Sequence, residues 1–259
     1  TSAFELQKMI RVTERYASSS STGDRYRFDY EGGYTIPAGR TVTYQKVVPI
    51  TDINVCNMRF YGSGKGLAGC HPVTFEYAVG ANVSNIHCSG TYCAAVMRFY
   101  CTHYITEDCS LVNPPDIETG GRGYFTQQLY CLYGTVRRCR TSNARHLNDF
   151  TSCGYMKVEN CTAINSAYSG FTTHGQFEHD LTYLNNTGTI AFAGSGETWG
   201  GSAKNIVVKK QVGEHIGGWL RTTNLTLEDC AAVANYNANP NLVAFKNGTI
   251  MVNCDGLIM

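Results

Sequence analysis

The chain has 259 residues, of which only 16% are charged, and a formal net charge of +1. A charge so close to zero excludes a general electrostatic attraction to nucleic acid or to an anionic membrane. No stretch approaches the roughly 18 consecutive apolar residues of a membrane span, so we expect neither nucleic-acid binding nor membrane insertion. The abundant Gly and Tyr favour strands and turns over helices.

Residues 1–50 do not follow the pattern of the remaining chain. A polar loop at 18–23 is followed by predicted strands at 34–42 and 47–55. An uncovered end of a stacked β-structure would expose backbone hydrogen-bonding groups and apolar core. We therefore expect residues 1–50 to form a lead-in and capping segment that covers the start of a second unit, residues 51–259.

Residues 51–259 contain an internal repeat. Six similar segments each consist of a short strand that ends at a corner, and their last residues are separated by 19 to 30 positions. Cys88 and Cys254 extend the series at its two ends. The six segments are Tyr104–Cys109, Gly134–Cys139, Met156–Cys161, Leu181–Asn186, Ile206–Gln211 and Leu225–Cys230.

The repeated units alternate in polarity or are β-branched, and Gly, Asn and Ser interrupt them. A helical solenoid would instead show a 3.6-residue period within each unit. The pattern predicts an all-β fold, a right-handed single-stranded parallel β-helix. Parallel coils stack at about 4.8 Å, so equivalent side chains form ladders along the axis.

The last residues of the six segments form one such ladder, which is made of thiols and amides. Small thiols pack as apolar groups, and stacked amides bond to one another. We expect these cysteines to be free thiols, with disulfides between neighbouring coils and metal binding as the alternatives. No cofactor is expected, although a divalent cation such as calcium is left open.

Two tyrosine-rich segments, residues 98–100 and 123–133, carry more aromatic side chains than a narrow β-helix interior holds. Some of these rings should therefore face a partner chain.

Reactive side chains are concentrated in residues 144–150, 172–180 and 194–200. Counting seven residues back from the strand starts at Met156 and Leu181 gives Asp149 and His174. The same count from Ile206 gives Trp199, with Glu197 two residues earlier. The register predicts Asp149, His174 and Glu197 at similar positions on three successive coils. Asp149 and Glu197 would then be roughly 10 Å apart, near the upper limit for an inverting carboxylate pair.

Two chemistries fit this set of residues. For a phosphodiester polymer, His174 would deprotonate a hydroxyl or water while Arg145 or Arg221 binds the phosphate. For a polysaccharide, the two carboxylates would act as acid and base and Trp199 would stack on the sugar. His146, Glu178 and Glu214 are further candidates for substrate contact, whereas we expect Asp180 to have a structural role.

Several sequence features resemble the pectate-lyase-type β-helix of phage tailspikes and pre-neck appendages. They are the lead-in Ile-Pro-Ala-Gly-Arg at 36–40, the entry coil at 53–62 and the coils ending in Val-x-Asn-Cys. This resemblance implies a homotrimeric spike on a virion tail or appendage, folded in the host cytoplasm and assembled with other virion tail proteins. It also implies that the spike binds, and often cleaves, a bacterial teichoic acid or capsular or wall polysaccharide. The Asp-rich triplets and signature Arg turn of calcium-dependent pectate lyases are missing.

The first hypothesis is therefore a virion spike domain that recognises and hydrolyses a bacterial surface polymer through Asp149, His174 and Glu197. One alternative is a non-catalytic adhesin that uses the same polar and aromatic face. The other alternative is a secreted bacterial polysaccharide lyase or epimerase. Incubation with purified polymer distinguishes these three functions. Release of fragments without added calcium indicates hydrolysis, unsaturated products indicate a lyase, and retention without product indicates the adhesin.

Overall fold

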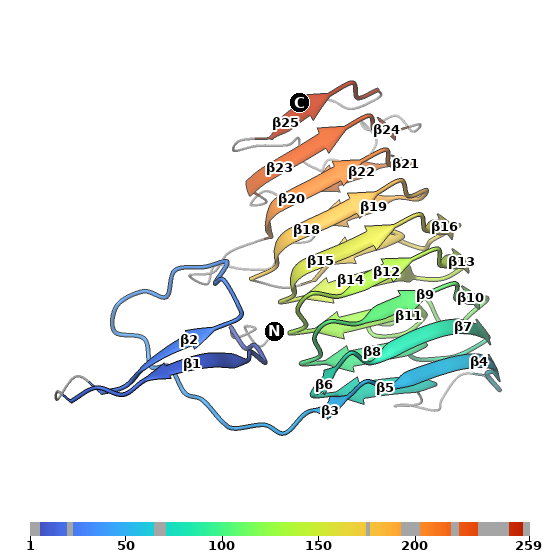
Figure 1. Cartoon of the computed structure of the whole chain (residues 1–259). Helices are drawn as coiled ribbons and strands as arrows, with labels where there is room; N and C mark the ends of the chain where they lie inside the picture. The colour runs from blue at the N-terminus through green and yellow to red at the C-terminus, as the bar shows by residue number, and fades with distance from the viewer. Residues whose placement is uncertain are drawn as a thin grey trace.

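Parallel strands stacked on one another make up most of the structure (Figure 1), a computed structural model that describes residues 6–19, 23–64, 71–174, 177–192, 203–218, 223–232 and 249–255. The strands form a right-handed β-solenoid in which each coil contributes to three walls, here called A, B and C. The predicted fold class is confirmed. No helix occurs in the described residues, and hence none that could cross a membrane.

Wall A begins with two long strands that also run through the first part of wall B. Along the axis its strands are β4 (Asn54–Tyr61), β7 (Asn82–Ser89), β9 (Ile105–Glu107), β12 (Thr135–Arg137), β15 (Gly154–Glu159), β18 (His179–Leu184), β20 (Lys204–Lys209), β23 (Thr223–Glu228) and β25 (Ile250–Val252).

Wall B consists of short strands, and wall C carries the candidate site. Wall B contains β10 (Ser110–Val112), β13 (Arg140–Ser142), β16 (Thr162–Ile164), β21 (Val212–Gly213) and β24 (Ala231–Ala232). Wall C contains β5 (Val73–Glu76), β8 (Val96–Phe99), β11 (Tyr124–Leu129), β14 (His146–Thr151), β17 (Phe171–Thr173), β19 (Ile190–Phe192) and β22 (Ile216–Gly218). A short pair, β3 (Ile50–Thr51) and β6 (Ala78–Val79), lies between walls C and A.

The corner between walls A and B is a column of residues with left-handed backbone conformation. Their φ angles lie between 49° and 58°, a region that Asn and Asp tolerate better than most residues. Seven of the nine are Asn or Asp, which explains the Asn-Cys and Asp-Cys pairs in the sequence. The column is Asn57, Asn85, Asp108, Arg138, Asn160, Asn185, Lys210, Asp229 and Asn253.

The predicted ladder of thiols and amides follows this corner directly, and its members from Cys109 to Cys230 are buried. Their thiols are free, as predicted. The extension to Cys254 is also in register, because Glu228 pairs with Val252. The extension to Cys88 is wrong. Cys88 pairs with Leu111, and Ile86 is the residue whose amide lies beside the Cys109 thiol.

Apolar side chains fill most of the interior, but one coil contains a buried arginine. Arg98 is fully buried on β8 and donates to Thr106 Oγ1 and to the Ala81 carbonyl. Its Cζ atom lies 4.2 Å from the centroid of the Tyr104 ring. Within the described residues no carboxylate forms an ion pair with it, so hydrogen bonds and the aromatic ring balance this charge.

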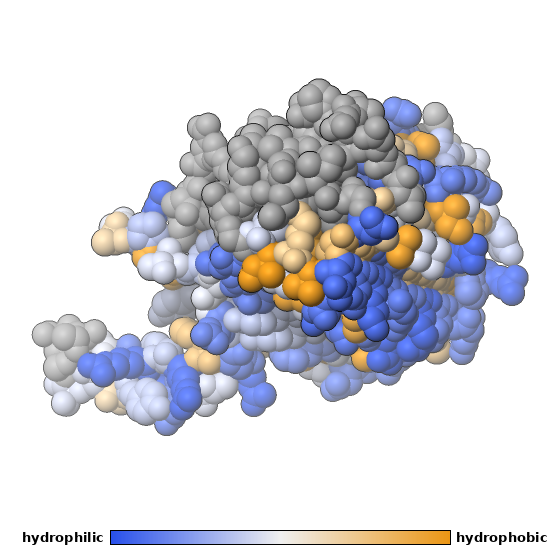
Figure 2. Space-filling model, turned by 90° about the horizontal axis from the view of Figure 1, so that it is seen from above, coloured by the Kyte–Doolittle hydropathy of each residue, from blue (hydrophilic) through white to orange (hydrophobic). Residues whose placement is uncertain are grey.

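The N-terminal segment contacts the side of the solenoid. Its hairpin, β1 (Val12–Tyr16) and β2 (Arg25–Phe28), projects from the body in both overall views (Figure 1 and Figure 2). Residues on either side of the hairpin are anchored along the corner between walls C and A, where Tyr100, Tyr133 and Tyr155 bond to Gln7, Asp29 and Glu31 respectively.

We expected the N-terminal segment to cap the first coil, but its described residues lie along the side of the solenoid. Most of β4 is exposed, including Met58 and Tyr61, so the described N-terminal residues leave that strand uncovered. Tyrosines of the two tyrosine-rich segments pack against other tyrosines of the same chain. Tyr77, Tyr100 and Tyr130 stack face to face outside the core, with ring centroids 4.8 and 5.0 Å apart. These stacks remove part of the reason for expecting a partner chain.

Candidate active site

Asp149 and His174 meet on the outer face of wall C. Asp149 lies on β14 between Asn148 and Phe150, whose side chains point inward, and His174 follows the end of β17. Nδ1 of His174 lies 2.8 Å from Oδ1 of Asp149. The amide of His174 also donates to the Phe150 carbonyl at 2.9 Å, so both backbone and ring attach this residue to β14.

The two side chains differ strongly in exposure, which gives them different roles. The Asp149 side chain is 1% exposed and the His174 side chain 39%. The second oxygen of Asp149 accepts a long hydrogen bond, 3.4 Å, from Nε2 of Gln127. Since Nδ1 of His174 is held by the carboxylate, Nε2 is the ring nitrogen left to meet a ligand. The negative charge of Asp149 raises the pKa of His174 above its ordinary value.

The expected register was shifted by two residues. Asp149 pairs with Thr172 in the sheet, and Thr172 pairs with Ala191. The error arises at the corner before wall A. Gly154, which pairs with His179, follows Asp149 by five residues, whereas His179 follows Thr172 by seven. Counting back from strand starts assumes corners of equal length. His174 therefore reaches Asp149 from the corner and not from the facing position.

His146 forms the buried floor beside this pair. Its Nδ1 binds the Ser169 carbonyl, so the proton lies on Nδ1 and Nε2 is an acceptor. Nε2 is buried and has no hydrogen-bond partner among the described residues. Burial lowers the pKa of His146 to about 4, which keeps the ring neutral. Its centroid lies 4.7 Å from that of Tyr124 and 5.6 Å from that of His174.

Arg145 and Tyr168 border the pair on its exposed side. The Arg145 Cζ atom lies 4.2 Å from the centroid of Tyr168, a ring that is 54% exposed. Nη1 of Arg145 donates to the carbonyls of Ile117 and Glu118, and Nε is buried without a partner in the described part of the chain. Arg145 therefore anchors a loop at the edge of the site and packs against the Tyr168 ring.

Glu178 is not positioned for the substrate contact expected from the sequence. Its side chain is completely buried and points into the solenoid, in the column that contains Cys101, Cys131 and Cys153. Burial raises the pKa of its carboxyl to about 7. A side chain enclosed in this way cannot touch a polymer on the outer face.

The remaining predicted residues are distant or undescribed. Glu214 is exposed between β21 and β22, three coils beyond β14, which corresponds to roughly 14 Å. Glu197, Trp199 and Arg221 lie outside the described residues. The pairing of Asp149 with Glu197 at roughly 10 Å therefore stays a prediction.

Three neighbours of the pair, Tyr124, Gln127 and Tyr168, were missed by the sequence reasoning. Tyr124 and Gln127 belong to the tyrosine-rich segment 123–133, some of whose rings we expected to face a partner chain. Their position beside His146 and Asp149 follows from strand pairing, since Tyr124 pairs with His146 and Gln127 with Asp149. Only the correct register would have identified them.

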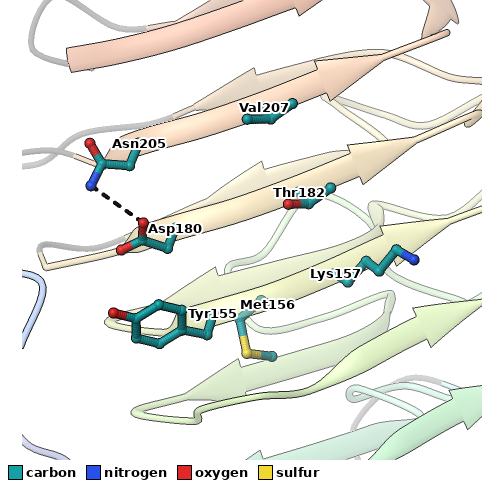
Figure 3. Close-up of a pocket in the computed structure, with 7 residues that line it drawn as sticks. All are labelled: Tyr155, Met156, Lys157, Asp180, Thr182, Asn205 and Val207. Atoms are coloured by element: carbon teal, nitrogen blue, oxygen red, sulfur yellow. Dashed lines mark hydrogen bonds between the residues drawn. The ribbon is translucent and has the colours of Figure 1, made fainter. Parts of the chain in front are cut away.

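A shallow pocket on wall A is separate from this site (Figure 3). It is lined by Tyr155, Met156, Lys157, Asp180, Thr182, Asn205 and Val207. Its charged groups already have partners within the chain, because Asp180 binds His179 and Asn205 and Lys157 pairs with Glu159. The pocket therefore offers few free groups to a ligand. In the described ranges no cluster of three or more His, Cys, Asp or Glu side chains is arranged to hold a metal ion.

No protein-family model matches the sequence, and no curated protein matches it. Among solved structures, the fold is similar to that of the Agl-KA catalytic domain, with a TM-score of 0.51 and 11% identity over 80% of this chain and 44% of that one. A variant of the catalytic domain of a GH87 alpha-1,3-glucanase in complex with nigerose has a TM-score of 0.46 and 8% identity, over 80% of this chain and 51% of that one. The chain thus spans about half the length of these structures, and the similarity shows the fold alone.

Proposed function

We propose that this chain binds and hydrolyses a polymer of the bacterial cell surface, either a teichoic acid or a capsular or wall polysaccharide, on the outer face of wall C. The observation that carries the proposal is the partly exposed His174, whose Nδ1 is held by the buried Asp149. A histidine fixed in this way presents Nε2 as a base, and the carboxylate stabilises the imidazolium that forms.

In the proposed reaction, Nε2 of His174 removes a proton from water or from a neighbouring polymer hydroxyl. The oxygen then attacks the scissile centre, the bond to the leaving oxygen breaks, and the imidazolium returns the proton to that oxygen, so that histidine ends the step neutral. Where a polymer hydroxyl attacks a phosphodiester, the product is a cyclic phosphodiester, which a water molecule activated by His174 opens in a second step to give the phosphomonoester. The guanidinium of Arg145 would stabilise negative charge that develops on a phosphate. Cleavage of a glycosidic bond would need a further acid, a role for which Glu197 remains the candidate.

The fold supports a catalytic role at a general level. The Agl-KA catalytic domain has a similar solenoid, so a stack of this kind can carry a catalytic site. We further propose, from the sequence resemblance, that the chain belongs to a homotrimeric virion tail or appendage protein that assembles with other tail proteins. Light scattering of the intact protein tests the trimer, and a monomer would count against it.

The central experiment is incubation of the purified protein with teichoic acid and with capsular polysaccharide. New reducing ends indicate glycosidic hydrolysis, and new phosphomonoesters indicate phosphodiester hydrolysis. Parallel reactions with calcium and with a chelator separate these outcomes from calcium-dependent elimination, which yields unsaturated ends. Unchanged polymer in every reaction would refute the hydrolase.

A non-catalytic adhesin is the second candidate, and one observation favours it. The exposed part of the site is a tyrosine ring and a histidine, whereas the carboxylate of Asp149 is fully buried. Aromatic and cationic groups of this kind can bind a polymer without breaking it. Retention of the protein on immobilised polymer without product would support the adhesin.

A further inference from the structure

A buried carboxylate lies behind the candidate site, in a column of otherwise small side chains. Glu178 follows Phe177, which has a φ of 70°, just as Cys153 follows Ser152 in the preceding coil. The column continues from Ala78 through the cysteines to Glu178 and Ala203, all buried. A charged group at this position is costly unless something stabilises it.

Glu178 and Lys8, which are far apart in the sequence, both form a hydrogen bond with Ser152. Oε1 of Glu178 accepts a hydrogen bond of 2.8 Å from the amide of Ser152. The ammonium group of Lys8, in the N-terminal segment, donates to the carbonyl of the same Ser152. The amide of Ser152 thus donates to Glu178, and the carbonyl of Ser152 accepts from Lys8.

Burial raises the pKa of Glu178 to about 7, and the charge of Lys8 opposes that shift. Burial also lowers the pKa of Lys8 to about 8. Each group therefore favours the charged state of the other. A second N-terminal residue, Tyr34, donates from its hydroxyl to the Glu178 carbonyl at 2.7 Å.

Ser152 connects these groups to the site because it directly follows β14, the strand that carries Asp149. His174 is attached to the same strand end through the Phe150 carbonyl and the Asp149 carboxylate. His174 and Glu178, the first and last residues of this corner, are therefore both hydrogen-bonded at the end of β14, His174 to the strand and Glu178 to the residue that follows it.

Resting on the proposed function of wall C, we propose that Glu178 and Lys8 form a brace that positions His174, so that the N-terminal segment is a working part of the site. Glu178 acts as a positioning residue and touches no substrate. Its negative charge adds to that of Asp149 in favouring the protonated imidazole of His174. The brace thus affects both the position and the proton affinity of the base.

The test uses the full chain with Glu178→Gln, which keeps an acceptor for the Ser152 amide and removes the charge. A second variant, Lys8→Met, removes the ammonium group and keeps an unbranched side chain. The matched controls are Glu76→Gln and Lys46→Met, two exposed positions far from Ser152. The readouts are an NMR titration of His174, hydrogen exchange of the Ser152 and His174 amides, and kcat and KM on polymer.

We expect Glu178→Gln to lower the pKa of His174, and Lys8→Met to speed exchange of the two amides about tenfold while wall A amides keep their rates. We expect kcat to fall about 10- to 100-fold with little change in KM, as for a displaced catalytic group. The controls should behave like the wild type.

Unchanged His174 titration and amide exchange in both variants would overturn the brace, even if the wild type cleaves polymer. Conversely, a wild type that cleaves no polymer removes the proposed function. Lowered His174 pKa and faster exchange would still support the brace in that case, because neither measurement depends on turnover.

Discussion

His174 lies two residues beyond the position that pairs with Asp149, and its ring turns back to form the 2.8 Å hydrogen bond with that carboxylate. His174→Gln keeps a polar side chain but loses the base, so we expect cleavage to fall by at least about 10²-fold. Folding should survive, because the side chain is 39% exposed. Initial rates on polymer, compared with thermal unfolding, check both expectations.

The control for this variant is His87→Gln, an exposed histidine on the part of β7 that runs through wall B, where it binds Ser110 and Asn85. This variant should cleave at the wild-type rate. If His174→Gln also retained full activity, the site would have to lie elsewhere.

The pH dependence follows from the raised pKa of His174. As a base, the ring must be neutral, so kcat/KM should rise with pH through a pKa above 6.5 and then level off. The stabilising contribution of the pair has the opposite trend: it is complete below about pH 6.5 and is lost as pH rises through the folded-state pKa. Asp149→Asn should move the inflection of kcat/KM to lower pH. An inflection that stays in place would contradict the assignment.

Glu178 should make the protein less stable at alkaline pH. Burial raises its pKa from 4.5 to about 7, so the folded chain binds more protons than the unfolded chain between these values. The contribution of the Glu178 carboxyl to the free energy of unfolding is therefore fully present below about pH 4.5 and is lost as pH rises to about 7. Glu178→Gln should increase the free energy of unfolding at about pH 8, by roughly 1 to 3 kcal/mol, and change it little at acidic pH. Urea denaturation at the two pH values measures the difference, and an equal effect at both would argue against a buried, titrating carboxylate.

Arg98 offers a test of the buried charge in the core. Arg98→Met fills a similar volume without the charge, and such exchanges are often neutral, so we expect a change within about 1 kcal/mol. Arg98→Ala leaves a cavity beside Tyr104 and should cost about 3 kcal/mol or more. Urea denaturation of both variants at one pH provides the comparison. If methionine were as harmful as alanine, the hydrogen bonds to Thr106 and Ala81 would be the dominant contribution.

The cysteine columns should be chemically inert in the folded protein. Burial raises the pKa of Cys131 to about 12. A hydrogen bond with Cys139 lowers the pKa of Cys109, but that thiol is buried like the others of the columns. A thiol-reactive dye should label the exposed Cys56 rapidly and the buried cysteines only after unfolding. Non-reducing mass analysis should detect no disulfide between Cys109, Cys139 and Cys161. Two or more disulfides would contradict the prediction of free thiols.

The sequence by itself determined the solenoid, the thiol and amide ladder beyond Cys88, and the concentration of reactive residues around 144–180. These features are local: a left-handed Asn or Asp followed by a thiol or another compact residue marks most corners between walls A and B, and alternation marks the strands. Any chain with that repeat buries its apolar side chains only by stacking coil on coil.

The tertiary structure decided which reactive residues meet. Corner length varies between coils, so register cannot be counted from strand starts, and a shift of two residues separates Thr172 from His174 beside Asp149. Glu178 faces inward because it follows the left-handed residue Phe177 in register with Cys153, which only the strand pairing reveals. The position of the N-terminal segment depends on contacts such as Gln7 with Tyr100, 93 residues apart, and on the link from Lys8 to Ser152, for which no local pattern exists.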